Sequence, residues 1–595
     1  MFSGTMQAHA LSHRAPTWPW LVLVALAAAL YLFGLGSFYA PTNGDEMVYI
    51  HIARMTAESG HWLPLQSELV GTRNTKPPLL IWQAMVAGGW GQHWSLFALR
   101  LPSIAYTFAT TALLAFFAHR MAPAPGKLRT ACIAAALYLL FFSTFRYGRV
   151  YLTSAPETFW LALPMWWLLW LHLRGRTVAS PAHQLGAWAY TLIGIAMGLG
   201  AAYKSFALVA PTAAALWCAV LLSEPWNWRP AVRTTVGVTW SALLGLGIFA
   251  LWFVLDPNPA EVWQEFVVAE NAGKMSSSLG YWQAALYGAY PMWTQLLAYP
   301  ANGGLLALPV LGFCLHALAR GWRPRYYAHL SPALWVLLAW LVVWLVVFTI
   351  PNQRSERYVI PAMPALAIAM ALLWDRLHRV WFAATLLITV PALVMLGRIA
   401  WVMGSLGMAS PTEVAMTLLA AGAGLAGAIA GFVRFSWVRN ATLLACLAVL
   451  GCFTLMVQPI SGDAAGYSTT VQSQMKGQRL AVPNGFTGQY ERFHFVLPGA
   501  RITPYDAEGR NTGALYPEMP APQRLDRLLK EFDAVVWLQD DLNEQPSCLP
   551  HCRLVAQRWH VKSRHKDGEV TLDNLWQPQL WLFRREWLLT PAAGG

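Results

Sequence analysis

The sequence predicts a polytopic α-helical membrane protein with about thirteen transmembrane helices, followed by a small soluble α/β domain. Apolar residues make up 56% of the 595 residues, and charged residues make up 12%, about half the ~25% of soluble domains. Apolar runs at 18–35, 334–350 and 441–457 can each cross a hydrocarbon layer about 30 Å thick. Charge density then rises near residue 460, where we place the domain boundary.

The two parts differ in charge balance. Residues 1–460 hold 26 Lys and Arg against 13 Asp and Glu, whereas residues 461–595 hold 15 of each sign. The whole net charge of +13 therefore lies in 1–460, the predicted transmembrane domain, and 461–595 have soluble composition. A pI of about 9.5 can indicate a protein that binds nucleic acid, but basic loops that orient a membrane protein also raise the pI. Because the basic excess lies in the transmembrane part, we expect no nucleic-acid partner.

The loops between the spans predict the orientation. With a cytoplasmic N-terminus, the cytoplasmic loops carry 15 basic residues against the acids Glu224 and Asp375, and the other side carries 11 of each sign. Because basic loops stay in the cytoplasm, we expect a periplasmic C-terminal domain. We expect the first span to be retained, since no small-residue cleavage site follows it. The spans begin near residues 17, 97, 131, 157, 187, 205, 235, 301, 332, 359, 380, 412 and 441.

Two long loops are predicted on the periplasmic side, at about 37–96 and 256–300. Both contain short amphipathic stretches, which we interpret as helices lying in the membrane interface. Residues 48–55 form one helical stripe, and Pro77-Pro78 begins an aromatic-rich second helix. Proline in the first turn and tryptophan at headgroup depth are typical of such helices.

Charged residues of the membrane part gather at the periplasmic ends of the spans, and almost none falls near the bilayer centre. A cation-coupled transporter would need ionisable groups near that centre. Carboxylates and cations at one water–lipid boundary favour a substrate with an anionic headgroup and a lipid tail, because cations hold phosphate and a carboxylate accepts a proton from an attacking hydroxyl. The set comprises Asp45, Glu46, Lys76, Arg100, Arg146, Arg149, Glu157, Lys204, Glu270, Lys274, Arg354, Glu356 and Arg357.

Several polar residues of the first long loop have two interpretations. Asn-Gly-Asp-Glu at 43–46 supplies either a general base or a polar start for the next helix. Lys76 either binds phosphate or only extends along the interface. His51, His61 and His93 are compatible with a metal site, but their spacing matches no ligand set, and we interpret them as exposed interfacial histidines.

Cys548 and Cys552 lie in the motif Cys-Leu-Pro-His-Cys of the soluble domain. An oxidising compartment permits a disulfide between them. A zinc site with His551 is the alternative, but two thiols and one histidine do not complete a structural zinc site. We favour the disulfide, although the spacing alone does not decide.

Seven short motifs follow one another in the first 380 residues. They are Asp45-Glu46, Ile52-Ala53-Arg54, Lys76-Pro77-Pro78-Leu79, Arg100-Leu101-Pro102-Ser103, Gly198–Lys204, Glu270-Asn271 and Arg357-Tyr358-Val359-Ile360-Pro361-Ala362-Met363-Pro364. Their order resembles that of the GT-C membrane glycosyltransferases. Within these, the chain is most similar to the branch that holds the undecaprenyl-phosphate aminoarabinose:lipid A transferase and relatives of the dolichyl-phosphate-mannose–protein mannosyltransferases.

The resemblance implies an inverting glycosyltransferase of the bacterial inner membrane. Such an enzyme moves a hexosyl or pentosyl group from a polyprenyl (undecaprenyl) phosphate donor to a lipid, glycan or protein acceptor at the periplasmic face, without a cofactor. It implies Asp45 as the catalytic carboxylate and Lys76, Lys204, Arg357 and Tyr358 around the donor phosphate. Deprotonating the acceptor and neutralising the leaving group are the two tasks. Further substrate contacts are implied at Glu46, Arg54, Arg149, Ser154, Glu157, Glu270, Asn271 and Lys274.

The chain also departs from this family. Val48 stands where relatives usually have arginine, and Ser154 occupies the second acidic position, for which Glu157 one turn later is a substitute. Thr75 and Asn271 replace the two positions that bind a metal in the aminoarabinose branch, so we expect no metal. These departures keep an inactive GT-C-like scaffold open. A lipid-linked sugar flippase or transporter is the other alternative, but the sequence shows neither inverted repeats nor midplane charges.

The soluble part is expected to be a small α/β unit without a recognisable catalytic motif. It either covers the acceptor entrance or only stabilises the fold. The expected elements are strands at 479–482, 534–538 and 579–583 and an amphipathic helix at 521–532.

Overall fold

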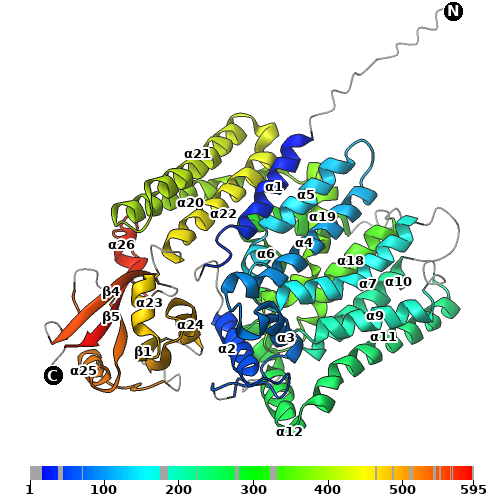
Figure 1. The fold of residues 1–595 in the computed structure, drawn as a ribbon. Helices are drawn as coiled ribbons and strands as arrows, with labels where there is room; N and C mark the ends of the chain where they lie inside the picture. Colours follow the sequence, from blue (N-terminus) through cyan, green and yellow to red (C-terminus); the bar gives the residue numbers. More distant parts are fainter. Residues whose placement is uncertain are drawn as a thin grey trace, which may run out of the picture.

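The structure is a computed structural model of the 595-residue chain. A helical part is followed by a smaller sheet-containing domain, which lies beside one end of the helices (Figure 1). The described residues are 17–37, 44–69, 71–174, 185–223, 226–274, 280–321, 331–461, 466–485, 488–507, 514–539, 544–548, 551–562, 565 and 567–592.

Long apolar helices form the first part. The α-helices of its first half are α1 (Trp18–Leu32), α2 (Gly44–Glu58), α3 (Pro78–Ala87), α4 (Leu96–Met121), α5 (Lys127–Leu140), α6 (Phe142–Tyr147), α7 (Ser154–Arg174), α9 (Ala187–Ala201), α10 (Val209–Leu222) and α11 (Trp228–Leu255). Those of the second half are α12 (Pro259–Val262), α13 (Tyr281–Tyr287), α14 (Met292–Leu296), α15 (Ala298–Gly303), α16 (Ala307–Gly321), α18 (Pro332–Val347), α19 (Met363–Leu372), α20 (Arg379–Ser405), α21 (Pro411–Val433) and α22 (Val438–Ser461). Short 3₁₀ helices and one π-helix, η3 (Trp263–Asn271), lie between them in the described chain. The 3₁₀ helices are η1 (Gly89–Gly91), η2 (Phe206–Leu208), η4 (Ala272–Lys274), η5 (Gly304–Leu306), η6 (Glu356–Ala362), η7 (Trp374–Arg376) and η8 (Phe435–Trp437).

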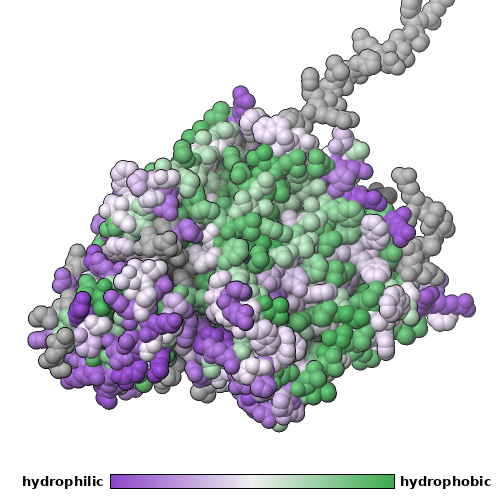
Figure 2. Space-filling model, in the orientation of Figure 1, coloured by the Kyte–Doolittle hydropathy of each residue, from purple (hydrophilic) through white to green (hydrophobic). Residues whose placement is uncertain are grey.

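Six helical segments in the described chain are long and apolar enough to cross a membrane. They expose apolar side chains outward, as Leu243, Leu251 and Val254 do on α11, and apolar residues cover much of the helical part (Figure 2). An apolar exterior of this size requires a lipid solvent. The chain is therefore a multi-pass membrane protein, and the number of thirteen spans stays a prediction. The six are Leu96–Met121, Trp228–Leu255, Ala298–Arg320, Arg379–Ser405, Pro411–Val433 and Phe435–Gln458.

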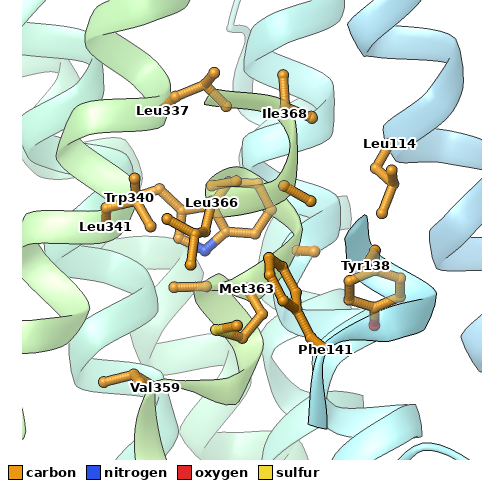
Figure 3. Close-up of a cluster of buried hydrophobic side chains, with 14 of the residues drawn as sticks. Leu114, Tyr138, Phe141, Leu337, Trp340, Leu341, Val359, Met363, Leu366 and Ile368 are labelled. Carbon is orange, nitrogen blue, oxygen red and sulfur yellow. The ribbon is translucent and has the colours of Figure 1, made fainter. Parts of the chain in front are cut away.

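Large side chains fill the centre of the helical bundle. Trp340 of α18 is fully buried beside Met363 and Leu366 of α19, and Phe141 packs against the same group (Figure 3). Figure 3 shows Trp340, Leu366, Met363 and Phe141 close together, with Tyr138 near the end of α5 on the side of Phe141. Interlocking of large rings fixes how these helices pack against one another.

The predicted helices of the first long loop are present, but α2 does not lie exposed in the interface. Nine of its 15 residues are buried, because α2 lies between the membrane helices and the C-terminal domain (Figure 1). Helix α2 is therefore covered by protein on most of its surface, and the placement of residues 48–55 in the membrane interface stays a prediction. Helix α3 begins at Pro78, as expected, with Pro77 in extended conformation before it.

The C-terminal domain contains a five-stranded sheet in the order β2-β1-β3-β5-β4. Strand β1 is parallel to β2 and β3, whereas β5 is antiparallel to both β3 and β4. The strands are β1 (Arg479–Asn484), β2 (Arg501–Asp506), β3 (Ala534–Gln539), β4 (Cys552–Val561) and β5 (Phe583–Pro591). Its helices are α23 (Thr469–Met475), η9 (Gln489–Arg492), α24 (Phe493–Val496), α25 (Ala521–Glu531) and α26 (Pro578–Trp581).

Most elements predicted for this domain are confirmed, and the closing strand is misplaced. The strands at 479–482 and 534–538 and the helix at 521–532 correspond to β1, β3 and α25. Residues 579–583 fall on α26 instead, because Pro578 starts a helical turn, and the strand begins only at Phe583. Strand β5 lies between β3 and β4 and pairs with both. It is therefore an interior strand of the sheet, and its residues Leu588 and Leu589 are buried.

Cys548 and Cys552 form a disulfide with their Cα atoms 5.5 Å apart. The bond ties the segment before β4 to the first residue of that strand. His551, which the zinc alternative required, is exposed.

Candidate functional site

Three ion pairs lie where α7, α9 and η6 meet the first turn of α2 and the residues before α3. They are Asp45–Arg357, Lys76–Glu270 and Lys204–Glu157, which we call the ionic cluster. Each pair joins segments far apart in the sequence, by 312, 194 and 47 residues respectively. The cluster therefore exists only in the folded chain.

Asp45 lies in the first turn of α2, and its Oδ2 is 3.2 Å from Nη1 of Arg357. Arg357 is the second residue of η6, where the Ser355 hydroxyl accepts a hydrogen bond from the Arg357 backbone N–H. The guanidinium also lies over the ring of Tyr147, 4.8 Å from its centroid. Asp45 is 45% exposed and Arg357 28%, so this carboxylate is the most accessible acid of the cluster.

Lys76 immediately precedes the two prolines that start α3. Its Nζ is 2.8 Å from Oε1 of Glu270 and donates to the backbone carbonyl of Thr75. The ammonium also lies over the ring of Tyr49, 5.7 Å from its centroid. Because Lys76 is only 14% exposed, it is held in the cluster and does not extend along a membrane surface.

Lys204 follows the last turn of α9, and its Nζ is 2.9 Å from Oε1 of Glu157 in the first turn of α7. The ammonium lies 5.7 Å from the ring centroid of Tyr358. Ser154 and Glu157 are both buried, and neither the Ser154 hydroxyl nor Glu157 Oε2 has a hydrogen-bond partner among the described residues. Buried polar atoms of this kind are costly unless a ligand or water satisfies them.

The three pairs share one electrostatic environment. Tyr49 lies within range of the charges of Asp45, Glu157, Glu270 and Arg357. Lys204 in turn interacts with Lys76 and Arg357, and Tyr358 interacts with Lys76, Arg357 and Glu270. The cluster is balanced, with three cations against three carboxylates. An incoming phosphate would compete with the carboxylates for these cations.

Asn271, the last residue of η3, lies beside this cluster. Its side-chain oxygen accepts a hydrogen bond from Ser205, which follows Lys204, and its amide donates to the carbonyl of Phe266. Thr75 donates its hydroxyl to the carbonyl of Thr72. Within the described part of the chain, no three His, Cys, Asp or Glu side chains come close enough to hold a metal ion.

Several residues predicted as substrate contacts lie outside the cluster. Glu46 is fully buried, where Arg100 donates to both its oxygens at 2.7 and 2.8 Å. Arg149 is also buried and donates to the carbonyls of Tyr31 and Phe33. Arg54 binds the C-terminal domain. The side chain of Lys274 lies outside the described residues.

The histidine interpretation also needs correction. His51 is fully buried in α2 and does not lie exposed in the interface, whereas His61 and His93 are exposed as predicted. Sequence reasoning further missed Tyr49, Tyr147 and Ser205, which contact the charged residues of the site or their neighbours. Tyr49 lies between two of the motifs and Tyr147 lies in none of them, and nothing in their spacing separates them from ordinary core aromatics.

An apolar groove of about 790 Å³ runs between α4, α7 and α9. One of its lining residues, Trp160, is one helical turn after Glu157. The indole of Trp160 donates to the hydroxyl of Tyr106, which is 3.2 Å from the hydroxyl of Tyr203, the neighbour of Lys204. The groove and the ionic cluster are thus adjacent. The groove is lined by Leu113, Phe116, Phe117, Trp160, Leu163, Pro164, Trp166, Trp167, Trp170, Leu192, Ile193, Ile195 and Ala196.

The fold and the first half of the sequence match proteins of one class. Residues 17–264 match the family model for dolichyl-phosphate-mannose-protein mannosyltransferase. The whole chain superposes on the crystal structure of ArnT from Cupriavidus metallidurans bound to undecaprenyl phosphate, with a TM-score of 0.56 and 16% identity over 97% of this chain and 99% of that one. The chain therefore has the fold of the GT-C membrane glycosyltransferases.

Two curated relatives make the resemblance more specific. They are the undecaprenyl phosphate-alpha-4-amino-4-deoxy-L-arabinose arabinosyl transferases of Yersinia enterocolitica and Sodalis glossinidius. The chain is 26% identical to the first over 358 residues and 27% identical to the second over 361 residues. These matches cover 58% and 59% of this chain and span 58% of the length of each relative.

Proposed function

We propose that the chain is an inverting glycosyltransferase that uses a polyprenyl phosphate sugar donor. The observation that carries this proposal is the junction of the ionic cluster with the apolar groove between α4, α7 and α9. A phosphate needs fixed cations, and an isoprenoid chain needs an apolar surface that opens to lipid. Phe116, Trp170 and Ile195 at the groove are partly exposed, so the groove opens to the outer surface of the helical part.

The cations and Asp45 have separate tasks in this reaction. Lys76, Lys204 and Arg357 hold the donor phosphate, and Tyr358 lies beside Lys204. As Arg357 turns to the phosphate, its ion pair with Asp45 weakens, and Asp45 can accept the proton of an acceptor hydroxyl. The acceptor oxygen then bonds to the anomeric carbon while the bond from that carbon to the phosphate oxygen breaks on the opposite face. Polyprenyl phosphate leaves with its negative charge held by the cations.

The sugar contacts are assigned to Glu157 and Glu270, two acids of the ionic cluster, and to their neighbours. We propose Glu157, Ser154, Glu270 and Asn271 for this role, because the first two carry buried atoms without a partner among the described residues and the others border the cations. The named relatives support undecaprenyl phosphate-linked aminoarabinose, a pentose, as the donor, and the family match includes mannosyl transfer. The acceptor is a lipid, glycan or protein.

We also propose that the ionic cluster faces the periplasm from the bacterial inner membrane. The basic loops of the membrane part support this orientation, since they lie between the spans on the side opposite to the balanced charges of the cluster. The Cys548–Cys552 disulfide supports it as well, because such bonds persist in an oxidising compartment.

Lys204→Ala is expected to weaken binding of undecaprenyl phosphate by at least about tenfold, the value of one charge-assisted hydrogen bond. Binding of undecaprenyl phosphate to the purified protein in detergent measures this loss. Lys530→Ala, in α25 of the C-terminal domain, is the control and is expected to bind like the wild type. Equal affinities of all three proteins would remove Lys204 from the phosphate site.

Ala196→Trp is expected to fill the floor of the groove, because Ala196 is buried and lines it. We expect at least about fivefold weaker binding of undecaprenyl phosphate, since apolar contact area is lost, and unchanged binding of geranyl phosphate, whose chain is too short to need the groove. Leu387→Trp, on the exposed face of α20, is the control. An equal loss for both phosphates would show that the substitution disturbs the headgroup site and would refute a chain-binding groove.

A further inference from the structure

We propose that the C-terminal domain positions the catalytic helix α2, and that Glu491 is the positioning residue. The proposal rests on the proposed function insofar as Asp45, in the first turn of α2, is the catalytic carboxylate. It assigns a task to the C-terminal domain and to two residues of α2, His51 and Arg54, which contact that domain outside the ionic cluster.

Glu491 lies in η9 and binds two residues on one face of α2. Its Oε1 is 2.6 Å from Nε of Arg54, and its Oε2 is 3.0 Å from both Nη2 of Arg54 and Nδ1 of His51. The side chains of His51 and Glu491 are fully buried and that of Arg54 is 15% exposed. The two-pronged arginine contact fixes direction as well as distance.

His51 has a single arrangement in this contact. Its Nε2 accepts a hydrogen bond from the backbone N–H of Glu68, so its Nδ1 carries the proton that it donates to Glu491. The neutral imidazole therefore connects three segments: α2, the loop before α3, and the C-terminal domain. Tyr490 adds an edge contact, with its ring centroid 5.8 Å from that of His51.

The contact is firmly attached to the C-terminal domain on its other side. Arg492, next to Glu491, donates to Oε2 of Glu586 at 3.3 Å in the middle of β5. Glu586 is fully buried and also accepts hydrogen bonds from Arg558 and from the hydroxyl of Tyr467. The sheet is therefore linked to α2 through Glu491 and Arg492, two adjacent residues of η9.

Close backbone packing accompanies the ionic contact. Gly488, which precedes η9, has a φ of +77°, and a Cβ placed there would lie 2.9 Å from Cγ2 and 3.2 Å from Cα of Val48. Only glycine adopts this conformation at low cost and leaves room for the approach. Val48 is one helical turn after Asp45, so the domain meets α2 next to the catalytic turn.

Helix α2 is thus held from two directions. Glu46 binds Arg100 on the membrane side, and His51 and Arg54 bind Glu491 on the domain side. Asp45 projects between these contacts toward Arg357. Burial raises the pKa of Glu491, but the hydrogen bonds from His51 and Arg54 lower it by more than burial raises it. The pKa of Glu491 therefore lies below its usual value, and the carboxylate is charged at neutral pH.

Glu491→Gln tests this role in the full-length protein in lipid nanodiscs. We expect hydrogen exchange of residues 44–58, measured by mass spectrometry, to quicken by at least about tenfold. We expect kcat to fall by at least about tenfold with KM unchanged, since small displacements of a reacting group cost this much. The donor probe is undecaprenyl phosphate-linked 4-amino-4-deoxy-L-arabinose. Arg54→Lys, which retains the charge but loses the two-pronged contact, is expected to give a smaller change in both measurements.

The matched control is Glu531→Gln, which breaks an exposed ion pair of the same domain that does not contact α2. It is expected to behave like the wild type in exchange and turnover. Unchanged exchange of residues 44–58 in Glu491→Gln would overturn the proposal, and so would faster exchange with wild-type kcat. A wild-type protein that transfers no sugar would count against the proposed function, while the exchange measurement would still decide whether Glu491 holds α2.

Discussion

Asp45→Asn is expected to lower sugar transfer by about 10²–10⁴-fold, the usual contribution of a general base. An amide cannot take the proton of the acceptor hydroxyl, whereas asparagine keeps the size of the side chain. The substitution is expected to change stability by less than about 1 kcal/mol, because Asp45 is 45% exposed and water screens its pair with Arg357.

Turnover of the purified variant with the lipid-linked donor measures this effect, and binding of undecaprenyl phosphate reports whether the site is still assembled. The control is Asp533→Asn, which removes an exposed carboxylate of the C-terminal domain paired with Arg479. Wild-type turnover in Asp45→Asn would remove Asp45 from the reaction. Loss of both turnover and undecaprenyl phosphate binding would instead assign Asp45 to the assembly of the site.

Glu46→Ala is expected to cost about 3–5 kcal/mol of stability, because it leaves the guanidinium of Arg100 buried without its carboxylate. Both side chains are fully buried, and Glu46 also accepts a hydrogen bond from the backbone N–H of Tyr151 at 2.9 Å. The measurement is the loss of folded protein with temperature in detergent, where the apparent Tm is expected to fall by several degrees.

Two further variants separate charge from packing at this position. Glu46→Leu combined with Arg100→Met replaces the pair by apolar groups and is expected to recover much of the loss. Asp375→Ala breaks the exposed pair with Arg129 and is expected to cost less than about 1 kcal/mol. A Glu46→Ala protein as stable as Asp375→Ala would show that the buried pair contributes little.

The neighbours Asp45 and Glu46 show how far the sequence predicts the site. Both stand in one acidic pair, and sequence reasoning assigned both to substrate chemistry. In a helix, consecutive residues point about 100° apart, so one of them faces Arg357 and the other enters the core against Arg100. The motif locates the helix start, but its orientation decides which carboxylate is accessible.

The same limit applies to partners that are distant in sequence. Lys76, Lys204 and Arg357 could be selected as cations at span ends, since charge is rare in apolar segments. Their carboxylate partners could not be assigned, because ion pairing depends on helix packing. His51 and Glu491 are 440 residues apart, and neither lies in a pattern that indicates the other.

The sequence by itself determined the class of this protein: a multi-pass helical membrane part followed by a small α/β domain. Composition and charge are sufficient for this, because lipid and water select side chains by polarity along every segment. The tertiary structure alone decided which charges form the ionic cluster, that the apolar groove adjoins it, and that the C-terminal domain holds α2. These features arise from contacts between remote segments, and no local preference of the chain encodes them.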